Sequence, residues 1–305
     1  MYDVVIIGGG VAGLAAGMYS GRLGMKTLIV GDNLGGTITL TTGIENYPGF
    51  KSISGAELAG KLREHAQEYG AELLEDLAID VRRAGNCFEI STSGKKFLSK
   101  CIIFATGTKH RKLEVPGAEK FENQGVHYCA LCDGPFYRDK VAAVIGGGDS
   151  AAKEALLLAT YAKKVYIIYR GEKIRPESIN AKRIEGSKKI EVITRANVVE
   201  IKGDANVSCA VLDREYKGSR ELEVDGLFVA IGSVPLSELA KKLGVETNEK
   251  GEIKIDRQAK TNVGGIFAAG DVTDTAFKQA ITGAAEGVTA AYSAYRYVNE
   301  KEFMC

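Results

Sequence analysis

The sequence predicts an α/β fold made of two dinucleotide-binding (Rossmann-like) domains, the second inserted into the first. A short apolar strand, a glycine-rich turn, a helix and a second strand follow one another at the amino terminus, and the same order recurs from Val141 onward. The second glycine loop starts at Gly146, 138 positions after Gly8, which is too long a period for an array of small repeats. The tail after the second unit is too short for a domain of its own, so we expect it to complete the first.

The overall composition narrows the range of functions. Among 305 residues, 40 Lys and Arg face 39 Asp and Glu, and a net charge of +1 argues against a general nucleic-acid binder. The longest uncharged run, Val4–Gly21, contains six glycines, so we do not expect a membrane span. The chain starts without the basic and apolar blocks of a secretory signal, which favours a cytoplasmic location.

The first unit begins with a predicted strand over Tyr2–Ile7, whose continuous apolar run suits a parallel strand buried on both faces. A helix over Val11–Leu23 and a strand over Lys26–Val30 should complete it. Gly55–Glu75 is charged and amphipathic, which predicts a helix, and Cys101–Phe104 reads as a strand after the strand-like alternation of residues 78–97.

The second unit repeats the pattern with a strand over Val141–Ile145, a helix over Ser150–Tyr161 and a strand over Lys164–Tyr169. A strand-rich stretch, Ile190–Val229, follows, and an Ala-rich helix is expected over Gln279–Val298. We therefore predict a first domain from residues 1–112 and 239–305, and an inserted domain from residues 113–238.

The first glycine loop, Gly8-x-Gly10-x-x-Gly13, lies between a predicted strand and a predicted helix, as a dinucleotide fingerprint requires. The first glycine makes the tight turn, the second lets the backbone approach a pyrophosphate, and the third lets helix and strand pack closely. The acidic residue expected about 20 positions further on, for a ribose hydroxyl, is Asp32.

The second loop, Gly146-x-Gly148-x-x-Ala151, is the alanine-ended variant of this fingerprint. An arginine after its second strand accommodates a 2′-phosphate, whereas an acidic residue suits a free hydroxyl. Arg170 and Arg175 favour NADP(H). Glu172 opposes this preference unless its side chain faces solvent.

Six cysteines at irregular spacing, at positions 87, 101, 129, 132, 209 and 305, do not form a disulfide framework. Cys129 and Cys132 are separated by two residues, the spacing used in thiol–disulfide exchange. A zinc site is the alternative; His127 could join the pair, but a fourth ligand is missing. Asp133 is a candidate proton donor or acceptor, or a loop carboxylate without that role. Cys305, the last residue, is expected on an exposed end.

The combined motifs resemble the low-molecular-weight flavoprotein thioredoxin reductases over essentially the full length. The matching pieces are the loop from Gly8 to Gly13, the run Gly35–Gly49, Ala105-Thr106-Gly107, Cys129–Gly134, the loop from Gly146 to Ala151, and Ala269-Gly270-Asp271. The resemblance implies the pyridine nucleotide-disulfide oxidoreductase fold, FAD on the outer domain and NADPH on the inserted one. It also implies a thioredoxin-like protein as substrate and a homodimer, with neither nucleic acid nor membrane as partner.

By this resemblance, electrons pass from NADPH through FAD to the Cys129–Cys132 disulfide, with the inserted domain rotating between the two half-reactions. Cys132 would face the flavin, Cys129 would attack the protein substrate, and Asp133 would serve as acid and base. The residues implied for FAD are Gly8, Gly10, Gly13, Asp32, Gly35, Gly36, Thr37, Asn46, Ala105, Thr106, Gly107, Gly270, Asp271, Lys278, Gln279 and Ala280. Those implied for NADPH are Gly146, Gly148, Asp149, Ser150, Ala151, Arg170 and Arg175.

Two departures from the family pattern keep alternatives open. The phosphate-reading signature His-Arg-Arg-x-x-x-Arg appears as Tyr169-Arg170-Gly171 followed by Arg175, one arginine short, and Lys278 stands where many members carry Arg. Ferredoxin or a reduced deazaflavin could therefore replace NADPH. A small-molecule or peroxiredoxin-system disulfide could replace thioredoxin, and a non-catalytic FAD-binding sensor is a third possibility.

Overall fold

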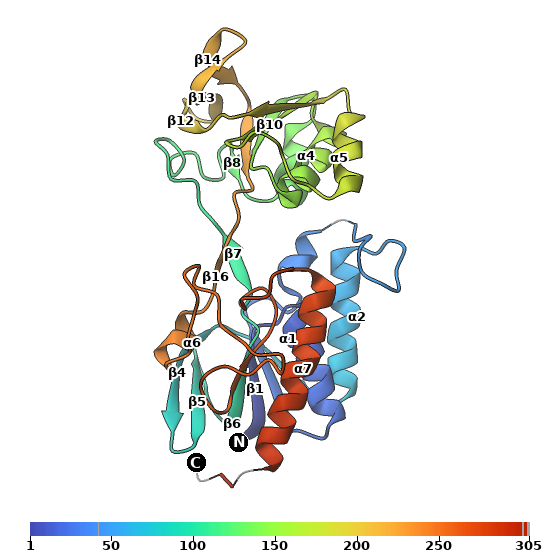
Figure 1. Ribbon diagram of the computed structural model, residues 1–305, viewed down its shortest axis with the longest axis vertical. Helices are drawn as coiled ribbons and strands as arrows, with labels where there is room; N and C mark the ends of the chain where they lie inside the picture. The colour runs from blue at the N-terminus through green and yellow to red at the C-terminus, as the bar shows by residue number, and fades with distance from the viewer. Residues whose placement is uncertain (42, 301, 304–305) are drawn as a thin grey trace. The chain divides into compact units, whose positions relative to one another are not determined.

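The computed structural model describes residues 1–41, 43–300 and 302–303, and it divides the chain into two compact units (Figure 1). Unit 1 contains residues 1–109 and the chain from 234 onward, and unit 2 contains residues 110–233. The second unit is therefore an insertion in the first. Its boundaries lie a few residues before the expected 112/113 and 238/239.

Unit 1 is built on a seven-stranded sheet in the order β3-β2-β1-β6-β5-β4, with β17 also paired to β6. β1, β2, β3, β6 and β17 are parallel, while β4 and β5 form an antiparallel extension. The strands are β1 Tyr2–Ile7, β2 Thr27–Gly31, β3 Glu72–Glu75, β4 Ala78–Ala84, β5 Cys87–Thr92, β6 Lys96–Phe104 and β17 Ile266–Ala268. The helices are α1 Val11–Arg22, α2 Gly55–Glu68, α6 Glu238–Lys242 and α7 Ala280–Asn299, with a 3₁₀ turn over Gly36–Leu40.

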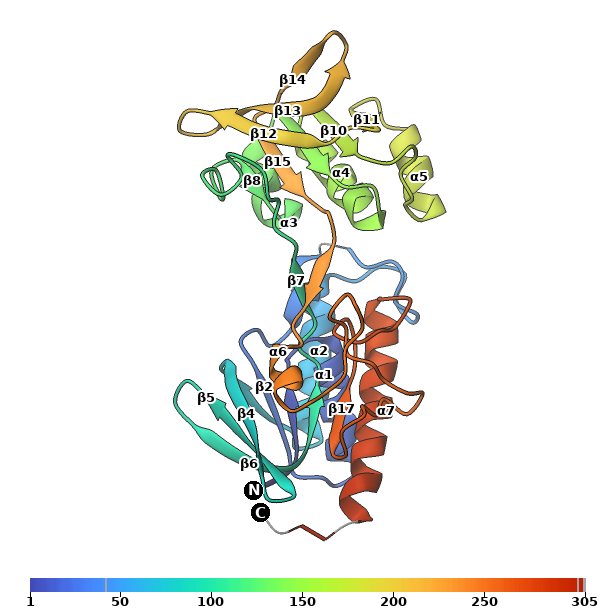
Figure 2. The ribbon, with the colours of Figure 1, turned by 60° about the vertical axis from the view of Figure 1, so that its left-hand side comes forward.

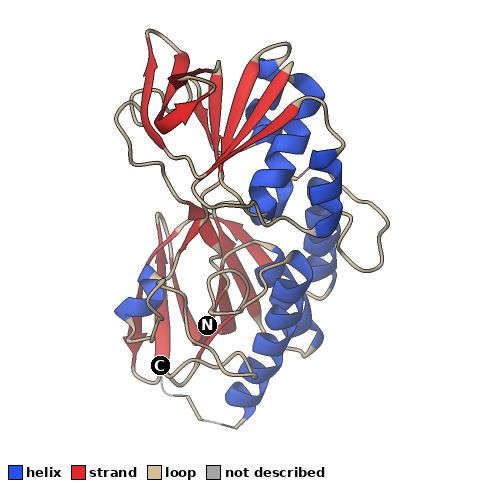
Figure 3. Cartoon of the chain, turned by 45° about the horizontal axis from the view of Figure 1, so that its top comes forward, coloured by secondary structure: helices blue, strands red, loops and turns tan. Residues whose placement is uncertain are grey.

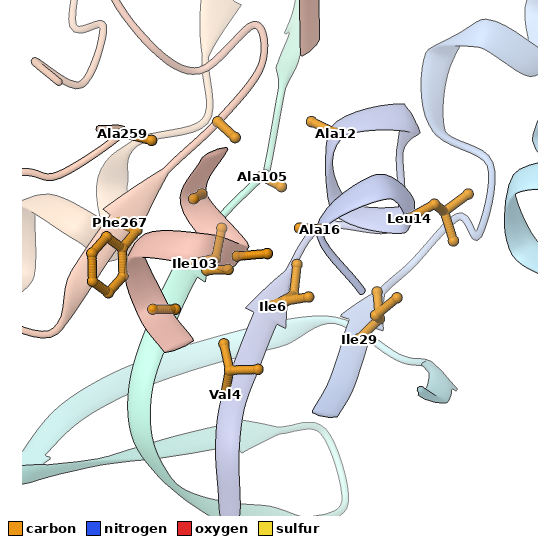
Figure 4. Close-up of a cluster of buried hydrophobic side chains, with 14 of the residues drawn as sticks. Val4, Ile6, Ala12, Leu14, Ala16, Ile29, Ile103, Ala105, Ala259 and Phe267 are labelled. Atoms are coloured by element: carbon orange, nitrogen blue, oxygen red, sulfur yellow. The ribbon is translucent and has the colours of Figure 1, made fainter. Parts of the chain in front are cut away.

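Both faces of this sheet are buried, as the apolar run of β1 predicts. Val4 and Ile6 point into one hydrophobic cluster, and Val5 and Ile7 into another on the opposite face. Helices α1, α2 and α7 gather on one side of the sheet (Figures 1 and 3). Figure 4 shows Ala16 of α1 near Ile6 and Ile103. The core thus holds the carboxyl end of β1 rigidly against the start of α1.

The predicted helix over residues 55–75 is too long. Helix α2 ends at Glu68, and residues 72–75 form the edge strand β3, paired to β2. Gly70 adopts a φ of +80°, the left-handed conformation that commonly ends a helix, and Ala71 is buried beyond it. Residues 72–75 form a strand because they pair with β2, and this long-range pairing leaves no local pattern in the sequence.

Unit 2 contains a five-stranded parallel sheet in the order β11-β10-β9-β15-β8 and a separate antiparallel sheet, β12-β13-β14 (Figure 2). The strands are β8 Val126–His127, β9 Val141–Ile145, β10 Lys164–Tyr169, β11 Ile190–Thr194, β12 Val198–Gly203, β13 Val207–Tyr216, β14 Ser219–Glu223 and β15 Gly226–Val229. The helices are α3 Ala130–Asp133, α4 Asp149–Tyr161 and α5 Ser178–Glu185, with a 3₁₀ turn over Gly134–Tyr137. The predicted strands 141–145 and 164–169 are confirmed.

The chain passes between the units twice, and the two connecting segments, here named the crossings, lie side by side. β7 (Thr108–His110) and β16 (Ser233–Pro235) pair as a two-stranded sheet. Across the described part of the chain, none of the helices combines the length and the apolar character that a bilayer crossing demands.

Candidate functional site

The first glycine loop connects β1 to α1, and its three glycines have different surroundings. A Cβ atom on Gly8, which has a φ of +117°, would lie 2.1 Å from the carbonyl oxygen of Ala105, and one on Gly13 would lie 1.9 Å from that of Gly8. At Gly10 the nearest heavy atom would be 3.8 Å away, at Gly36. Packing within the protein therefore requires glycine at positions 8 and 13, whereas the space over Gly10 is open.

The start of α1 faces this open space without a side-chain cap. Gly10 is the N-cap residue, and no side chain accepts a hydrogen bond from the first-turn N–H groups. Uncapped N–H groups and the positive end of the helix dipole suit an anion. The loop therefore fits the pyrophosphate of a dinucleotide.

The Gly35–Thr37 segment lies against the first loop. The amide of Gly35 donates to the carbonyl of Gly9 at 2.9 Å, and a Cβ atom on Gly36, with a φ of +67°, would lie 2.7 Å from Cα of Gly10. Thr37 is exposed next to this contact, and Asp32 directly follows β2 with an exposed side chain. The structure thus brings these predicted residues to one edge of the sheet, as expected for the carboxyl ends of parallel strands.

Asn46 and Gln279 meet although 233 positions separate them. Nδ2 of Asn46 donates to Oε1 of Gln279 at 2.9 Å. Gln279 is also the N-cap of α7 in a capping box with Thr282, so its side chain is held where Ala280 begins the helix. This pairing joins two residues that the family resemblance implies near a flavin.

The Gly270–Asp271 turn is tied to α7 and to a neighbouring loop. The amide of Gly270 donates to Glu286 at 2.8 Å, and Gly270 has a φ of +79°. Nζ of Lys278 donates to the backbone carbonyl of Asp271 at 2.9 Å and pairs with Glu252 at 2.5 Å. Lys278 therefore anchors this turn through its ammonium group.

The segment Ala105-Thr106-Gly107 packs against the first glycine loop and leads into the chain segment that connects unit 1 to unit 2. The amide of Ala105 donates to Ile7 at 2.8 Å, and its carbonyl closes the space under Gly8. The hydroxyl of Thr106 donates to the backbone of Leu236 at 2.7 Å, and the carbonyl of Gly107 accepts from the amide of Leu236 at 3.0 Å. Thr106 and Gly107 thus hold the incoming and outgoing chains together.

The second glycine loop repeats the first in unit 2. A Cβ atom on Gly146, which has a φ of +147°, would lie 2.3 Å from the carbonyl oxygen of Ala230 and 3.1 Å from Cβ of Ala151. Gly148 is the uncapped N-cap of α4, and a Cβ atom there would meet nothing within 4 Å. Asp149 instead binds the start of α5, since Oδ1 accepts from Asn180 and from the amide of Glu177, both at 2.8 Å. Ser150 is exposed on the first turn.

Tyr169 covers one side of this loop. A Cβ atom on Gly147 would lie 2.4 Å from its ring, and its hydroxyl accepts a hydrogen bond from Nη2 of Arg175 at 3.0 Å. The amide of Arg175 donates to Gly147 at 2.6 Å, so Arg175 is fixed beside the loop. Arg170 is exposed next to Tyr169.

The structure adds Arg195, a residue that sequence reasoning missed. It follows β11 with a φ of +54°, and its Nη2 lies 2.7 Å from Oε1 of Glu172. Because β10 and β11 are parallel neighbours, their carboxyl ends share one sheet edge. The position of a basic residue directly after β11, the strand next to β10, is the sequence feature that indicates Arg195. Glu172, the residue that argued against a phosphate, is thus paired with an arginine.

Cys129 and Cys132 form a disulfide at the start of α3, with their Cα atoms 5.5 Å apart. Cys129 is the N-cap residue, and its Sγ accepts a hydrogen bond from the amide of Cys132 at 3.2 Å. Cys132 is exposed and Cys129 is half-buried. The pair is therefore both closed as a ring and reachable from solvent.

The carboxylate of Asp133 lies beside the imidazole of His127. Nδ1 of His127 is 3.1 Å from Oδ2 of Asp133, and Nε2 of His127 is 2.7 Å from the hydroxyl of Tyr137. His127 is 7 % exposed, and this burial lowers its pKa against the opposing charge of Asp133. Burial, with the charges of Asp133 and Asp225, raises the pKa of Tyr137 to about 12.

Glu154 of α4 is a second missed residue near the disulfide. Its Oε2 accepts from the amide of Ala130 at 2.5 Å. Burial raises the pKa of Glu154 to about 7, the Ala130 amide lowers it, and the charge of Asp133 raises it further. The surroundings of the cysteine pair thus hold several groups that exchange protons.

The zinc alternative finds no support in the part of the chain that the structure describes. No group of three or more His, Cys, Asp and Glu side chains there is placed to hold a metal ion. His127 directs its two ring nitrogens at Asp133 and Tyr137. Cys101 and Cys209 are free thiols, and Cys305 lies outside the described residues.

Comparison with known proteins places these features in a family. Residues 2–287 match the model of the pyridine nucleotide-disulphide oxidoreductases. A thioredoxin reductase of Listeria monocytogenes is 40% identical over 306 residues, covering 98% of this chain and 95% of the relative. The solved thioredoxin reductase of Lactococcus lactis, in its FR conformation, is 41% identical with a TM-score of 0.95, covering 99% of this chain and 100% of that one. A solved ferredoxin-flavin thioredoxin reductase of Clostridium acetobutylicum is 34% identical with a TM-score of 0.53, covering 98% and 99%.

Proposed function

Because the chain belongs to the pyridine nucleotide-disulphide oxidoreductase family and groups with its thioredoxin reductases, we propose that it reduces a thioredoxin-like protein with electrons from NADPH. Family membership implies a flavin and a pyridine nucleotide, and we propose FAD and NADPH. The observation that carries the proposal is the closed Cys129–Cys132 pair beside Asp133, in the same unit as the second glycine loop.

The residues around the first loop fit FAD. The open space over Gly10 and the uncapped start of α1 would hold its pyrophosphate, and the exposed Asp32 would bind a ribose hydroxyl. Asn46 and Gln279 would bind the flavin edge, and Asp271, whose carboxylate has no hydrogen bond among the described residues, would accept one from the ribityl chain. Bound FAD would take a hydride from the nicotinamide and supply two electrons to the disulfide.

Unit 2 would bind the nucleotide at the second loop. The open space over Gly148 suits its pyrophosphate, as at Gly10. Arg170, Arg175 and Arg195 are exposed near the ends of β10 and β11, and Arg195 pairs with the carboxylate of Glu172. This charge balance supports a 2′-phosphate and hence NADPH.

The exchange steps follow from the local geometry. After reduction, the amide of Cys132 would stabilise a thiolate at Cys129, which attacks the disulfide of the protein substrate. Asp133 would give a proton to the leaving thiolate and take one from an enzyme thiol. Cys132 then attacks Sγ of Cys129, which releases the reduced substrate and closes the ring.

We propose that unit 2 rotates between the half-reactions, since it carries both the second loop and the disulfide while unit 1 carries the flavin residues. The paired crossings β7 and β16 are the place for such a motion. Raising solvent viscosity should slow a turnover limited by this rotation. From the family resemblance we also infer a homodimer in the cytoplasm; light scattering should give twice the mass of the chain.

The test of the function is reduction of a thioredoxin coupled to a chromogenic disulfide, with NADPH as donor. A Cys129→Ser/Cys132→Ser variant should lose the thioredoxin-dependent rate, and the matched Cys209→Ser variant should keep it. A Cys132→Ser variant should trap the substrate on Cys129. Normal turnover by the double variant would overturn the proposal.

A ferredoxin-type donor is the second candidate, favoured by the incomplete arginine signature and by the likeness to the ferredoxin-flavin enzyme. An anaerobic absorbance titration with NADPH, NADH, reduced ferredoxin and reduced deazaflavin decides between them. We expect stoichiometric bleaching of the flavin by NADPH. Bleaching by reduced ferredoxin alone would replace NADPH as the donor and leave the acceptor assignment standing.

A further inference from the structure

A buried polar cluster lies behind the redox disulfide, formed by His127, Asp133 and Tyr137 against the ring of Phe228 and here named the His127 cluster. His127 sits on the edge strand β8, opposite Phe228 of β15, and its ring stacks on that of Phe228 with centroids 5.2 Å apart. The ring of Tyr137 packs edge-on against both, at 5.4 and 5.2 Å. The imidazole is therefore held in one orientation by aromatic contacts on two sides.

The hydrogen-bond partners decide which ring nitrogen carries the proton. A neutral imidazole has one donor and one acceptor nitrogen. The hydroxyl of Tyr137 lies 2.7 Å from Nε2 and can donate to it or accept from it, whereas an ionised Asp133 carboxylate can only accept. A ring proton on Nδ1 would face Oδ2 of Asp133, 3.1 Å away, and leave Nε2 to accept from Tyr137. Nδ1 makes no hydrogen bond of standard geometry among the described residues, so Asp133 is its nearest charged neighbour rather than a fixed partner.

We propose that His127 is a positioning residue for Asp133: its Nδ1–H, fixed by the hydrogen bond from Tyr137 to Nε2, orients the Asp133 carboxylate and stabilises its ionised form during thiol–disulfide exchange. This inference rests on the proposed function of Asp133 as acid and base. It gives His127 a role that the zinc hypothesis did not consider. His127 remains neutral in this role, because burial disfavours its protonated form.

The exchange step balances with one proton relayed through Asp133. The Cys129 thiolate forms a bond to one substrate sulfur, the substrate disulfide breaks, and the electron pair leaves on the second sulfur. Asp133 gives its proton to that sulfur and becomes a carboxylate, which the Nδ1–H of His127 stabilises. The carboxylate regains a proton from the Cys132 thiol as that sulfur attacks Cys129. The enzyme dithiol is oxidised, and the substrate disulfide is reduced.

Other titratable groups also face Asp133 and Tyr137. Glu154 of α4 carries a raised pKa partly because of the Asp133 charge. An ionised Glu154 would disfavour the negative charge of Asp133, whereas Asp225 acts on the hydroxyl of Tyr137. His127 is the one nitrogen donor that the described residues place against this carboxylate.

Two substitutions of His127 separate a positioning role from simple packing. In His127→Asn the amide nitrogen can occupy the place of Nδ1 and still donate to Asp133. In His127→Gln the amide reaches the place of Nε2, and the donor to Asp133 is lost. His65→Asn, in unit 1, is the matched control.

The first readout is the pH dependence of single-turnover oxidation of the reduced holoenzyme by hydroxyethyl disulfide. His127→Gln should move the limb that Asp133 controls upward by about one pH unit, because the carboxylate loses the nitrogen donor that lies 3.1 Å away. His127→Asn and His65→Asn should keep the limb in place. Equal shifts in the Gln and Asn variants, or none in either, would overturn the proposal. A limb unchanged in Asp133→Asn would instead overturn the acid–base role in the proposed function.

The second readout needs neither turnover nor a variant that folds well. The chain has three histidines, so a ¹⁵N-edited NMR spectrum of the oxidised holoenzyme resolves each imidazole. We expect the Nδ1–H tautomer for His127, with a protonation midpoint below the usual histidine range. The Nε2–H tautomer would overturn the proposal even if every kinetic variant failed to fold.

Discussion

Arg195 and Glu172 form an ion pair at the edge of the second parallel sheet, with Nη2 and Oε1 2.7 Å apart. The pair joins the ends of β10 and β11, and the second glycine loop follows the neighbouring strand β9. Both side chains are more than half exposed, so the pair contributes little to folding stability. The pair matters for electrostatics, because the positive charge of Arg195 offsets the negative charge of Glu172 near Arg170 and Arg175.

We predict that Arg195→Ala raises KM for NADPH roughly fivefold, about 1 kcal/mol, because Glu172 is then left to repel the 2′-phosphate. KM for NADH, which has no such phosphate, should change less than about twofold on the same argument. Steady-state kinetics with both nucleotides checks this. Glu172→Gln is the matched variant and should lower KM for NADPH. Equal effects on both nucleotides would show that the pair does not read the phosphate.

The glycine loops predict a contrast between fold and ligand binding. Gly10→Ala should leave the fold intact, because the added Cβ meets no atom closer than 3.8 Å, but it should release flavin. Gly13→Ala should destabilise the protein itself, since its Cβ would lie 1.9 Å from the carbonyl oxygen of Gly8. Flavin content after gel filtration and the thermal midpoint of the flavin-free protein separate the two effects. A Gly10→Ala variant that retains full flavin would place the dinucleotide elsewhere.

The exposed side chain of Phe136 is expected to contact the protein substrate. It lies four positions after Cys132 with 72 % of its surface exposed. Burying such a ring against a partner contributes about 1.5–3 kcal/mol, so Phe136→Ala should raise KM for thioredoxin at least about tenfold. Reduction of a small chromogenic disulfide should be unchanged. Val199→Ala, also an exposed apolar residue of unit 2, is the control and should alter neither rate.

The raised pKa of Glu154 should make the stability of the fold depend on pH. Its pKa is about 7 in the fold against 4.5 for the ordinary group, so the folded state binds the proton more tightly than the unfolded state does. The resulting stabilisation is complete below pH 4.5 and is lost as the pH rises through about 7. Glu154→Gln should flatten the decline of the thermal midpoint over this range, and Glu185→Gln, on the exposed face of α5, should not. A decline unchanged in Glu154→Gln would contradict the assignment.

The sequence predicted the parts of the fold that local patterns determine. The continuous apolar runs of β1, β9 and β10 and the glycine loops after β1 and β9 are where they were expected. For residues 72–75 the sequence predicts a helix, because their strand conformation comes from pairing with β2 and not from a local pattern. The family resemblance supplied Asn46 and Gln279, but only the fold shows that they touch.

Long-range contacts explain what sequence reasoning missed at the site. Arg195 is 23 positions from Glu172 and meets it through the sheet, and Glu154 reaches Ala130 from another helix. The sequence alone indicates His127 only as a possible metal ligand. Its actual partners, Asp133 and Tyr137, are close in sequence, yet a bend of the chain through α3 is needed to bring all three together.

The adjacent crossings at β7 and β16 make residues 110–233 a cassette with both ends at one place. Exchange of such a cassette between relatives would change only two junctions. Under the proposed function it would replace the sites for the electron donor and the protein acceptor together, while the residues proposed for the flavin stay the same. A chimaera joined at these two strands would show which partner preferences travel with the insert.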